Sequence, residues 1–331
     1  MNTIEGIAES IVETAGDYRT GDWGGFTTEH VVDWVQQFDN DAHKAILTEL
    51  DHVLKMTYFS GERVEAFLTG LATNAKLSGD DPEEFWAGAG VLDIQLRGNS
   101  QSEMLTRFDP VLQQEVGLGL DDCQGTSGTF VYLDDGVFSG NRVRRDLEKW
   151  IAETAPEQAR VHIIVNALHS NGHYYANDKL RQASHQAQKQ IETTWWRAHP
   201  IENQRAKKDE SQVLWPAAIP DEEDIQEFVE ELKNAGYPPQ LRLAGQTPTG
   251  NGVFSSEEGR AILETEFLRA GVKIRTDCPH LPDNARPLGF TLLRTLGFGA
   301  TTVNFRNCPN NCPLAFWAGD PWRPLFPRRT N

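Results

Sequence analysis

The sequence has few cysteines, comparatively few basic residues and no long apolar run. With only four cysteines in 331 residues, a disulfide framework is not expected. The 31 basic side chains are outnumbered by 48 acidic ones, giving a net charge of −17. This balance argues against a duplex-DNA binder, because neutralising phosphates requires a basic surface. No apolar stretch approaches the roughly 18 residues that a membrane-spanning helix needs, so no membrane association is expected.

The N-terminus also lacks the features of a signal peptide. It is acidic and has neither a basic segment nor an apolar core, so we expect a cytoplasmic protein. The nine tryptophans and sixteen phenylalanines supply more large apolar surface than a disordered chain carries. The sequence therefore predicts one large folded domain or two smaller ones.

Two of the cysteines, Cys308 and Cys312, are four residues apart in an Asn/Pro-rich segment. A zinc site would need two further ligands, and only Cys278 and His280 lie nearby in the sequence. Zinc and a loop with reduced thiols are both compatible with this spacing, and the loop is the simpler interpretation.

The first eighty residues have helical periodicity, with apolar residues at Val31, Trp34, Val35 and Phe38. The run Gly79 to Pro82 interrupts the pattern. We therefore expect an N-terminal helical cap over residues 1–84. An α/β domain with a C-terminal extension would then occupy residues 85–331, unless the two form one continuous domain.

The middle of the chain changes period. Residues 129–133 and 161–165 are short apolar runs typical of buried strands, and residues 141–154 between them are periodic like a helix. This order predicts a parallel βαβ unit, followed by a helix over about residues 175–191. Farther on, we expect helices at 221–232 and 255–269, the second ended by Gly271, and a strand at 298–306.

One segment combines a buried strand with polar groups suited to a sugar phosphate. It is VYLDDGVFSGNR, residues 131–142. Asp134 and Asp135 would lie at the carboxyl end of the strand, where open α/β sheets bind ligands. Backbone N–H groups around Ser139, Gly140 and Asn141 would face a phosphate at the start of the helix. The two carboxylates would accept hydrogen bonds from ribose hydroxyls or hold waters of a Mg²⁺ ion.

This segment resembles the signature with which type I phosphoribosyltransferases bind phosphoribosyl pyrophosphate (PRPP). Ser139 stands where threonine is commoner in that family. The resemblance implies a parallel sheet flanked by helices, a Mg²⁺ cofactor, catalytic roles for Asp134 and Asp135, and substrate contacts from residues 136–141: Gly136, Val137, Phe138, Ser139, Gly140 and Asn141.

A pyrophosphate loop should precede the acidic pair in that family. The candidate is Gly98, Asn99 and Ser100, between an alternating run and a helical segment; a capped loop without a ligand explains it as well. The flexible, lysine-containing loop that is usual in that family is not found in the sequence. The N-terminal helical cap and the Asn/Pro/Trp-rich C-terminal extension resemble those of divergent phosphoribosyltransferase-like proteins from bacterial conflict and antiphage operons. Some of those proteins are encoded beside retron reverse transcriptases.

Other polar residues are weaker candidates for the site. Arg306 and Asn307 could read the edge of a base, and Arg286 could contact a phosphate. His169 and His173 follow the second strand and could contact pyrophosphate or transfer a proton, although lone histidines are more often turn residues.

The sequence thus predicts a phosphoribosyltransferase-like protein that binds PRPP or a ribose 5-phosphate nucleotide with Mg²⁺. We expect it to act in bacterial antiphage defence, with a partner such as a reverse transcriptase. Whether it also transfers a phosphoribosyl group is left open by the sequence. The alternative is a non-catalytic module on the same fold that senses a nucleotide or binds RNA or protein.

Overall fold

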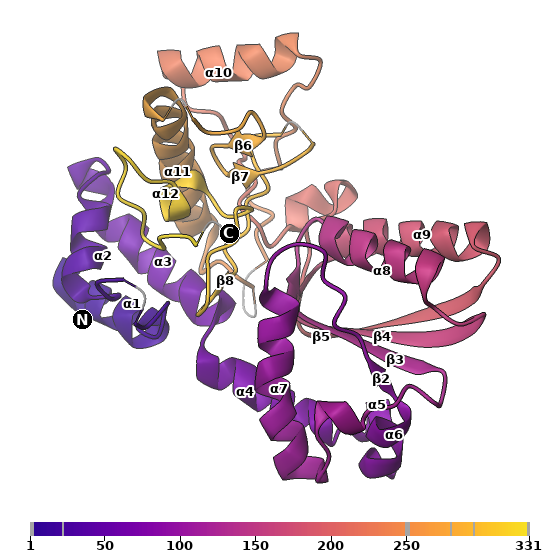
Figure 1. The fold of residues 1–331 in the computed structure, drawn as a ribbon. Helices are drawn as coiled ribbons and strands as arrows, with labels where there is room; N and C mark the ends of the chain where they lie inside the picture. Colours follow the sequence, from indigo (N-terminus) through magenta and orange to yellow (C-terminus); the bar gives the residue numbers. More distant parts are fainter. Residues whose placement is uncertain (1–2, 22, 249–251, 279, 294, 330–331) are drawn as a thin grey trace. The chain divides into compact units, whose positions relative to one another are not determined.

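The structure, a computed structural model, describes residues 3–21, 23–248, 252–278, 280–293 and 295–329. The chain forms two compact units (Figure 1). We call Gly61–Ile201 the sheet unit, and Met1–Ser60 together with Glu202–Asn331 the terminal unit. The boundary expected at residue 84 falls inside the sheet unit, in helix α6 (Pro82–Gly88).

The sheet unit contains a four-stranded parallel sheet in the order β2-β3-β4-β5. Helices on its faces complete the α/β fold that the sequence predicts. Its elements are α4 (Gly61–Ala72), α5 (Ala75–Ser78), α6 (Pro82–Gly88), β2 (Gly90–Val91), α7 (Ser100–Val116), a short 3-10 helix (Leu120–Asp122), β3 (Thr129–Val137), α8 (Asn141–Glu153), β4 (Gln158–His169), α9 (Ser170–Gln186) and β5 (Gln190–Ile201).

Both faces of the sheet are covered (Figure 1). Ile163 of β4 belongs to an apolar core that also contains residues of α8 and α9. The preceding residue, His162, points to the opposite face because side chains alternate along a strand. There its ring contacts Phe85 of α6, with 6.2 Å between centroids. Trp86 of α6 in turn contacts Phe108 of α7 at 5.1 Å, so α6 and α7 cover this second face.

The structure corrects two expectations about where helices end. The helix expected to reach residue 191 ends at Gln186, and β5 follows it. The sequence did not indicate β5 because it is an edge strand with many exposed polar residues, and its pairing along β4 stabilises it. In the terminal unit, α11 continues through Gly271 to Asp277. A Cβ at Gly271 would lie 2.5 Å from Pro287 Cα, so this glycine permits close packing and does not end the helix.

The terminal unit is mainly helical. It contains α1 (Ile4–Ala15), α2 (Thr28–Val35), α3 (His43–Thr57), α10 (Glu223–Asn234), α11 (Glu257–Asp277), α12 (Leu314–Trp317) and two short 3-10 helices (Asn40–Ala42 and Arg205–Glu210). Its strands pair as β1 (Tyr58–Phe59) with β8 (Val303–Asn304), and β6 (Ala285–Arg286) with β7 (Gly289–Phe290). The strand expected over residues 298–306 is therefore only two residues long.

The C-terminal segment packs against the N-terminal helices inside this unit. The Trp34 indole of α2 donates a hydrogen bond to the carbonyl of Ala315 at 2.9 Å. Phe326 is fully buried and packs against the rings of Tyr18 and Phe26. Aromatic packing thus joins the two ends of the sequence in one core.

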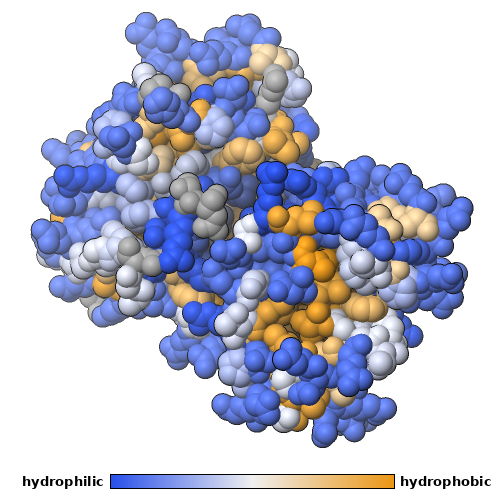
Figure 2. All heavy atoms as spheres, viewed as in Figure 1, coloured by the Kyte–Doolittle hydropathy of each residue, from blue (hydrophilic) through white to orange (hydrophobic). Residues whose placement is uncertain are grey.

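The molecular surface fits the composition. The face seen in Figure 2 is mainly hydrophilic, with an apolar area over the sheet unit. Within the described ranges, no helix combines the length and apolarity needed to cross a membrane.

Candidate functional site

The acidic pair lies near the end of β3, inside the strand. β3 pairs with β4 as far as Val137, two residues beyond Asp135, so the sheet holds both acids. Because strand side chains alternate, Asp134 shares a face with Tyr132 and Asp135 lies on the other face. Asp134 is buried and Asp135 is half-buried. The two carboxylates therefore meet different surroundings.

Asp134 is part of a polar network between β3 and α8. The Tyr132 hydroxyl donates to the Asp146 carboxylate at 2.9 Å and lies 3.5 Å from Asp134 Oδ2. Asp134 Oδ1 accepts the backbone N–H of Asp135 at 2.8 Å. The other oxygen of Asp146 accepts the backbone N–H of Leu96 at 3.1 Å. Sequence reasoning did not identify Tyr132, which belongs to the apolar strand part of the segment, or Asp146, which lies outside it.

Burial raises the pKa of Asp134 to about 7, and the negative charge of Asp135 contributes in the same direction. A hydrogen bond from Ser100 and the charge of Arg142 oppose the shift. The carboxyl group of Asp134 therefore changes charge close to neutral pH, where an ordinary aspartate is fully ionised.

The candidate pyrophosphate loop, Gly98–Ser100, lies beside this network. Ser100 Oγ accepts hydrogen bonds from Gln95 Nε2 at 2.9 Å and from Arg142 Nη1 at 3.1 Å, so its own proton is available for Asp134. A Cβ at Gly98 would lie 2.7 Å from Arg142 Nη1. The structure thus brings the Gly98–Ser100 loop and the acidic pair together, with the exposed Arg142 side chain of α8 between them.

The loop after β3 packs tightly against α9. Gly140 has a φ of +76° and precedes α8, and a Cβ there would lie 2.3 Å from the carbonyl oxygen of Gly172. Its conformation and the missing side chain are therefore required by packing. Close approach to a phosphate stays a prediction. Ser139 is exposed, and its hydroxyl accepts the N–H of Asn141 at 3.4 Å.

Replacing Gly140 is accordingly expected to destabilise the protein, beyond any effect on a ligand. Gly140→Ala adds backbone strain and a collision with α9, for a loss of about 2–5 kcal/mol in unfolding free energy. Gly117→Ala is the matched control, because Gly117 has a similar φ of +85° and a Cβ added there would have nothing within 4 Å. Chemical denaturation would measure both. Equal losses would show that the contact with Gly172 contributes nothing.

His169 holds the end of β3 in place. Its Nδ1 donates to the carbonyl of Val137 at 3.0 Å, and its ring lies 4.7 Å from that of Phe138. Burial lowers the pKa of His169 to about 3, so the ring is neutral at physiological pH. Burial and the charge of Arg197 also lower the pKa of His173, whose ring packs on Trp195. These contacts favour structural roles for both histidines.

The remaining predicted residues belong to the terminal unit. Arg286 is in β6. The backbone N–H of Arg306 donates to Asn304 Oδ1 at 2.9 Å, and Asn307 Oδ1 accepts the N–H groups of Cys308 and Arg329. Arg286, Arg306 and Asn307 thus belong to a different unit from the acidic pair, and their ligand contacts stay a prediction.

The cysteine segment shows no zinc ligand set in the part of the chain that the structure describes. Cys308 and Cys312 are fully buried, and the Cys312 thiol lies 3.3 Å from the carbonyl of Thr302. Among the described residues, no three His, Cys, Asp or Glu side chains are grouped so as to hold a metal ion.

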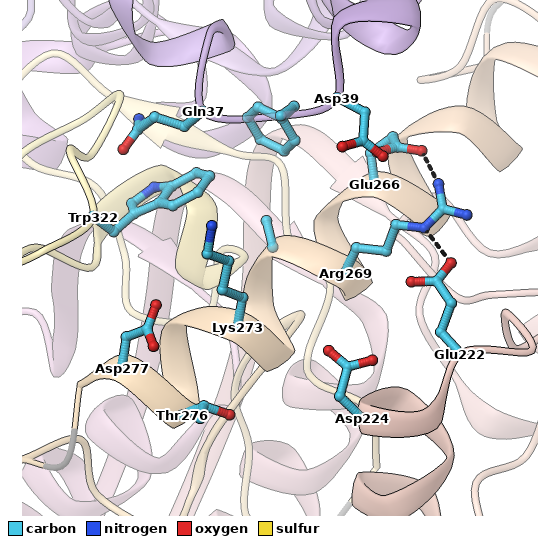
Figure 3. Close-up of a pocket in the computed structure, with 12 residues that line it drawn as sticks. Gln37, Asp39, Glu222, Asp224, Glu266, Arg269, Lys273, Thr276, Asp277 and Trp322 are labelled. Atoms are coloured by element: carbon cyan, nitrogen blue, oxygen red, sulfur yellow. Dashed lines mark hydrogen bonds and ion pairs between the residues drawn. The ribbon is translucent and has the colours of Figure 1, made fainter.

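The terminal unit contains a separate cavity of about 330 Å³ (Figure 3). Arg269 of α11 lies at one side, bound to Glu222 at 2.6 Å and to Glu266. Glu222 immediately precedes α10, at the acidic start of that helix. Lys273 and Trp322 line the other side of the cavity. None of the predicted substrate-binding residues lines it.

Comparison with known proteins identifies the family of the chain. A search of curated proteins and a search of solved structures returned no match. A family model described as PRTase-CE matches residues 31–328, which include the whole sheet unit with the acidic segment and most of the terminal unit. The chain therefore belongs to the PRTase-CE family, a phosphoribosyltransferase-like family.

Proposed function

We propose that the protein binds PRPP, or a related ribose 5-phosphate nucleotide, at the carboxyl ends of β2 and β3. The observation that carries this proposal is the network of Asp134, Ser100, Arg142 and Asp146, which links two loops that the sequence had suggested separately. The family supports a phosphoribosyltransferase-like function in general terms. Open α/β sheets bind ligands at this edge.

Each part of such a ligand has a matching group. The N–H groups at the start of α8, with the Ser139 hydroxyl, would bind the 5-phosphate, favoured by the helix dipole. Asp134 and Asp135 would accept hydrogen bonds from ribose hydroxyls. The Gly98–Ser100 loop and the cationic Arg142 would bind the pyrophosphate.

The donor atoms also suit Mg²⁺. Carboxylate and hydroxyl oxygens are the hard ligands that this ion prefers, and it commonly keeps several waters. Because Asp134 and Asp135 point to opposite faces of β3, we propose that they hold the ion through its waters. When bound, Mg²⁺ would neutralise charge on the pyrophosphate.

Transfer of the phosphoribosyl group would break the bond between C1 and the pyrophosphate oxygen while a base nitrogen bonds to C1. Positive charge develops on the sugar in such a reaction. The electron pair leaves with pyrophosphate, whose charge Arg142 would stabilise. The chain's contribution would be positioning and electrostatics, without a covalent nucleophile.

We further propose a cytoplasmic role in bacterial antiphage defence, with an operon partner such as a reverse transcriptase. This part rests on the resemblance of the helical front and the Asn/Pro/Trp-rich end to the divergent proteins described above. A regulator that binds the same ligand without turnover is the alternative, and the absence of a lysine loop from the sequence favours it.

Binding and turnover can be measured separately. Calorimetric titration with PRPP is expected to give binding that strengthens with Mg²⁺. Release of pyrophosphate in the presence of purine and pyrimidine bases would identify an enzyme, whereas binding without release would favour the regulator. If the wild type binds neither PRPP nor ribose 5-phosphate at millimolar concentration with Mg²⁺, the proposal is wrong.

A further inference from the structure

The side chain of one buried asparagine in the sheet has no hydrogen-bond partner among the described residues. Asn166 of β4 is 1% exposed. Neither its Oδ1 nor its Nδ2 has a hydrogen-bond partner among the residues that the structure describes. Buried polar side chains in folded proteins nearly always have partners, because burying an unpaired amide costs free energy. Because the unpaired amide destabilises the fold and makes no hydrogen bond in it, we interpret Asn166 as a ligand contact.

The strand register places Asn166 beside the acidic pair. The pairs Asp134–Val165 and Gly136–Ala167 put Asp135 and Asn166 at the same level on neighbouring strands. Val165 faces the core formed with α8 and α9, so Asn166 points to the opposite face, as Asp135 does. Neighbouring strands lie about 4.8 Å apart, which brings the two side chains within reach of one small ligand. Asp135 is only half-buried, so solvent reaches part of its side chain.

Resting on the proposed function, we infer that Asn166 is a specificity-determining residue that binds the ribose hydroxyls together with Asp135. A carboxylate only accepts hydrogen bonds, whereas a carboxamide both donates and accepts. The pair therefore matches two adjacent hydroxyls, each of which donates one hydrogen bond and accepts another. A 2-deoxy sugar would leave the buried amide unpaired, so the site should discriminate between ribose and 2-deoxyribose.

The inference is tested with ribose 5-phosphate and 2-deoxyribose 5-phosphate as probes. By calorimetry with Mg²⁺, the wild type is expected to bind the ribose compound about tenfold more tightly. Asn166→Val should reduce this ratio to about one. The melting temperature of the ligand-free variant should stay the same or rise, because an apolar strand-forming side chain replaces an unpaired amide. The affinity ratio reports only on folded protein, and Asn166→Ala provides a second variant without added volume.

Asn177 of α9 is the matched control. Its Oδ1 accepts hydrogen bonds from Thr193 Oγ1 at 2.9 Å and Trp195 Nε1 at 3.2 Å, so Asn177→Val should lower the melting temperature and keep the affinity ratio. If the Asn166 variants keep the ratio while the wild type shows it, the inference is wrong and the proposed function stands. A wild type that binds both sugars equally also overturns it. If the wild type binds neither, the proposed function fails and the inference with it.

Discussion

Replacing both acids, Asp134→Asn with Asp135→Asn, is expected to abolish the Mg²⁺-dependent part of PRPP binding. The amides keep the size of the side chains but remove two negative charges. Each lost charge-assisted hydrogen bond costs about 1.5–3 kcal/mol, roughly a ten- to hundredfold loss of affinity. The variant should fold, since an amide oxygen at position 134 can still accept the N–H of residue 135.

The control removes the same charge elsewhere in the sheet unit. Asp121 and Asp122 are also adjacent, and both are exposed. Changing this pair to asparagine should leave PRPP titrations with and without Mg²⁺ unchanged. Equal losses of affinity in the two double variants would mean that net charge, and not the acidic pair of β3, determines binding.

The raised pKa of Asp134 predicts that the stability of the protein depends on pH. The carboxyl group has a pKa of about 7 in the folded protein, above the ordinary value of 3.8. Between these values the folded state binds the extra proton, so the contribution of Asp134 to stability is complete below about pH 4 and declines as pH rises through 7. The titratable or charged groups around the Asp134 carboxyl group are Asp135, Asp146, Tyr132 and Arg142. Asp134→Asn should remove this component from melting temperatures measured between about pH 4 and 8.

Glu264→Gln is expected to cause the largest loss of stability in the terminal unit. Glu264 of α11 is 2% exposed and accepts hydrogen bonds from two buried guanidinium groups. Arg260 Nε lies 2.7 Å and Arg242 Nη2 2.9 Å from its carboxylate oxygens. The carboxylate also accepts the backbone N–H of Trp215 at 2.9 Å. Removing its charge leaves an excess of buried positive charge, at a cost of about 3–5 kcal/mol.

An exposed ion pair of the same unit is the control for this variant. Glu230 and Lys233 of α10 are 2.6 Å apart, with side chains 57% and 46% exposed. Glu230→Gln should change the unfolding free energy by less than about 1 kcal/mol, because water screens such pairs. Chemical denaturation followed by tryptophan fluorescence would compare the two. A loss below about 1 kcal/mol for Glu264→Gln would contradict the prediction.

Local patterns in the sequence were sufficient for the elements that carry the motif. The apolar runs at 129–133 and 161–165 predicted two parallel strands, and the helix between them followed from its periodicity. The edge strand β5 could not be predicted in this way. Several of its polar residues are exposed, and hydrogen bonds to β4, distant from it in the sequence, determine its conformation.

The sequence by itself determined the α/β class and the strand–loop–helix with its acidic pair, and it supplied the candidate residues for a sugar-phosphate site. The tertiary structure decided what surrounds each of them. Packing against Gly172 leaves no room for a side chain at Gly140, burial is the largest cause of the raised pKa of Asp134, and the strand register puts Asn166 beside Asp135. These properties depend on neighbours that are far apart in the chain, whereas a motif records only the residues that follow one another.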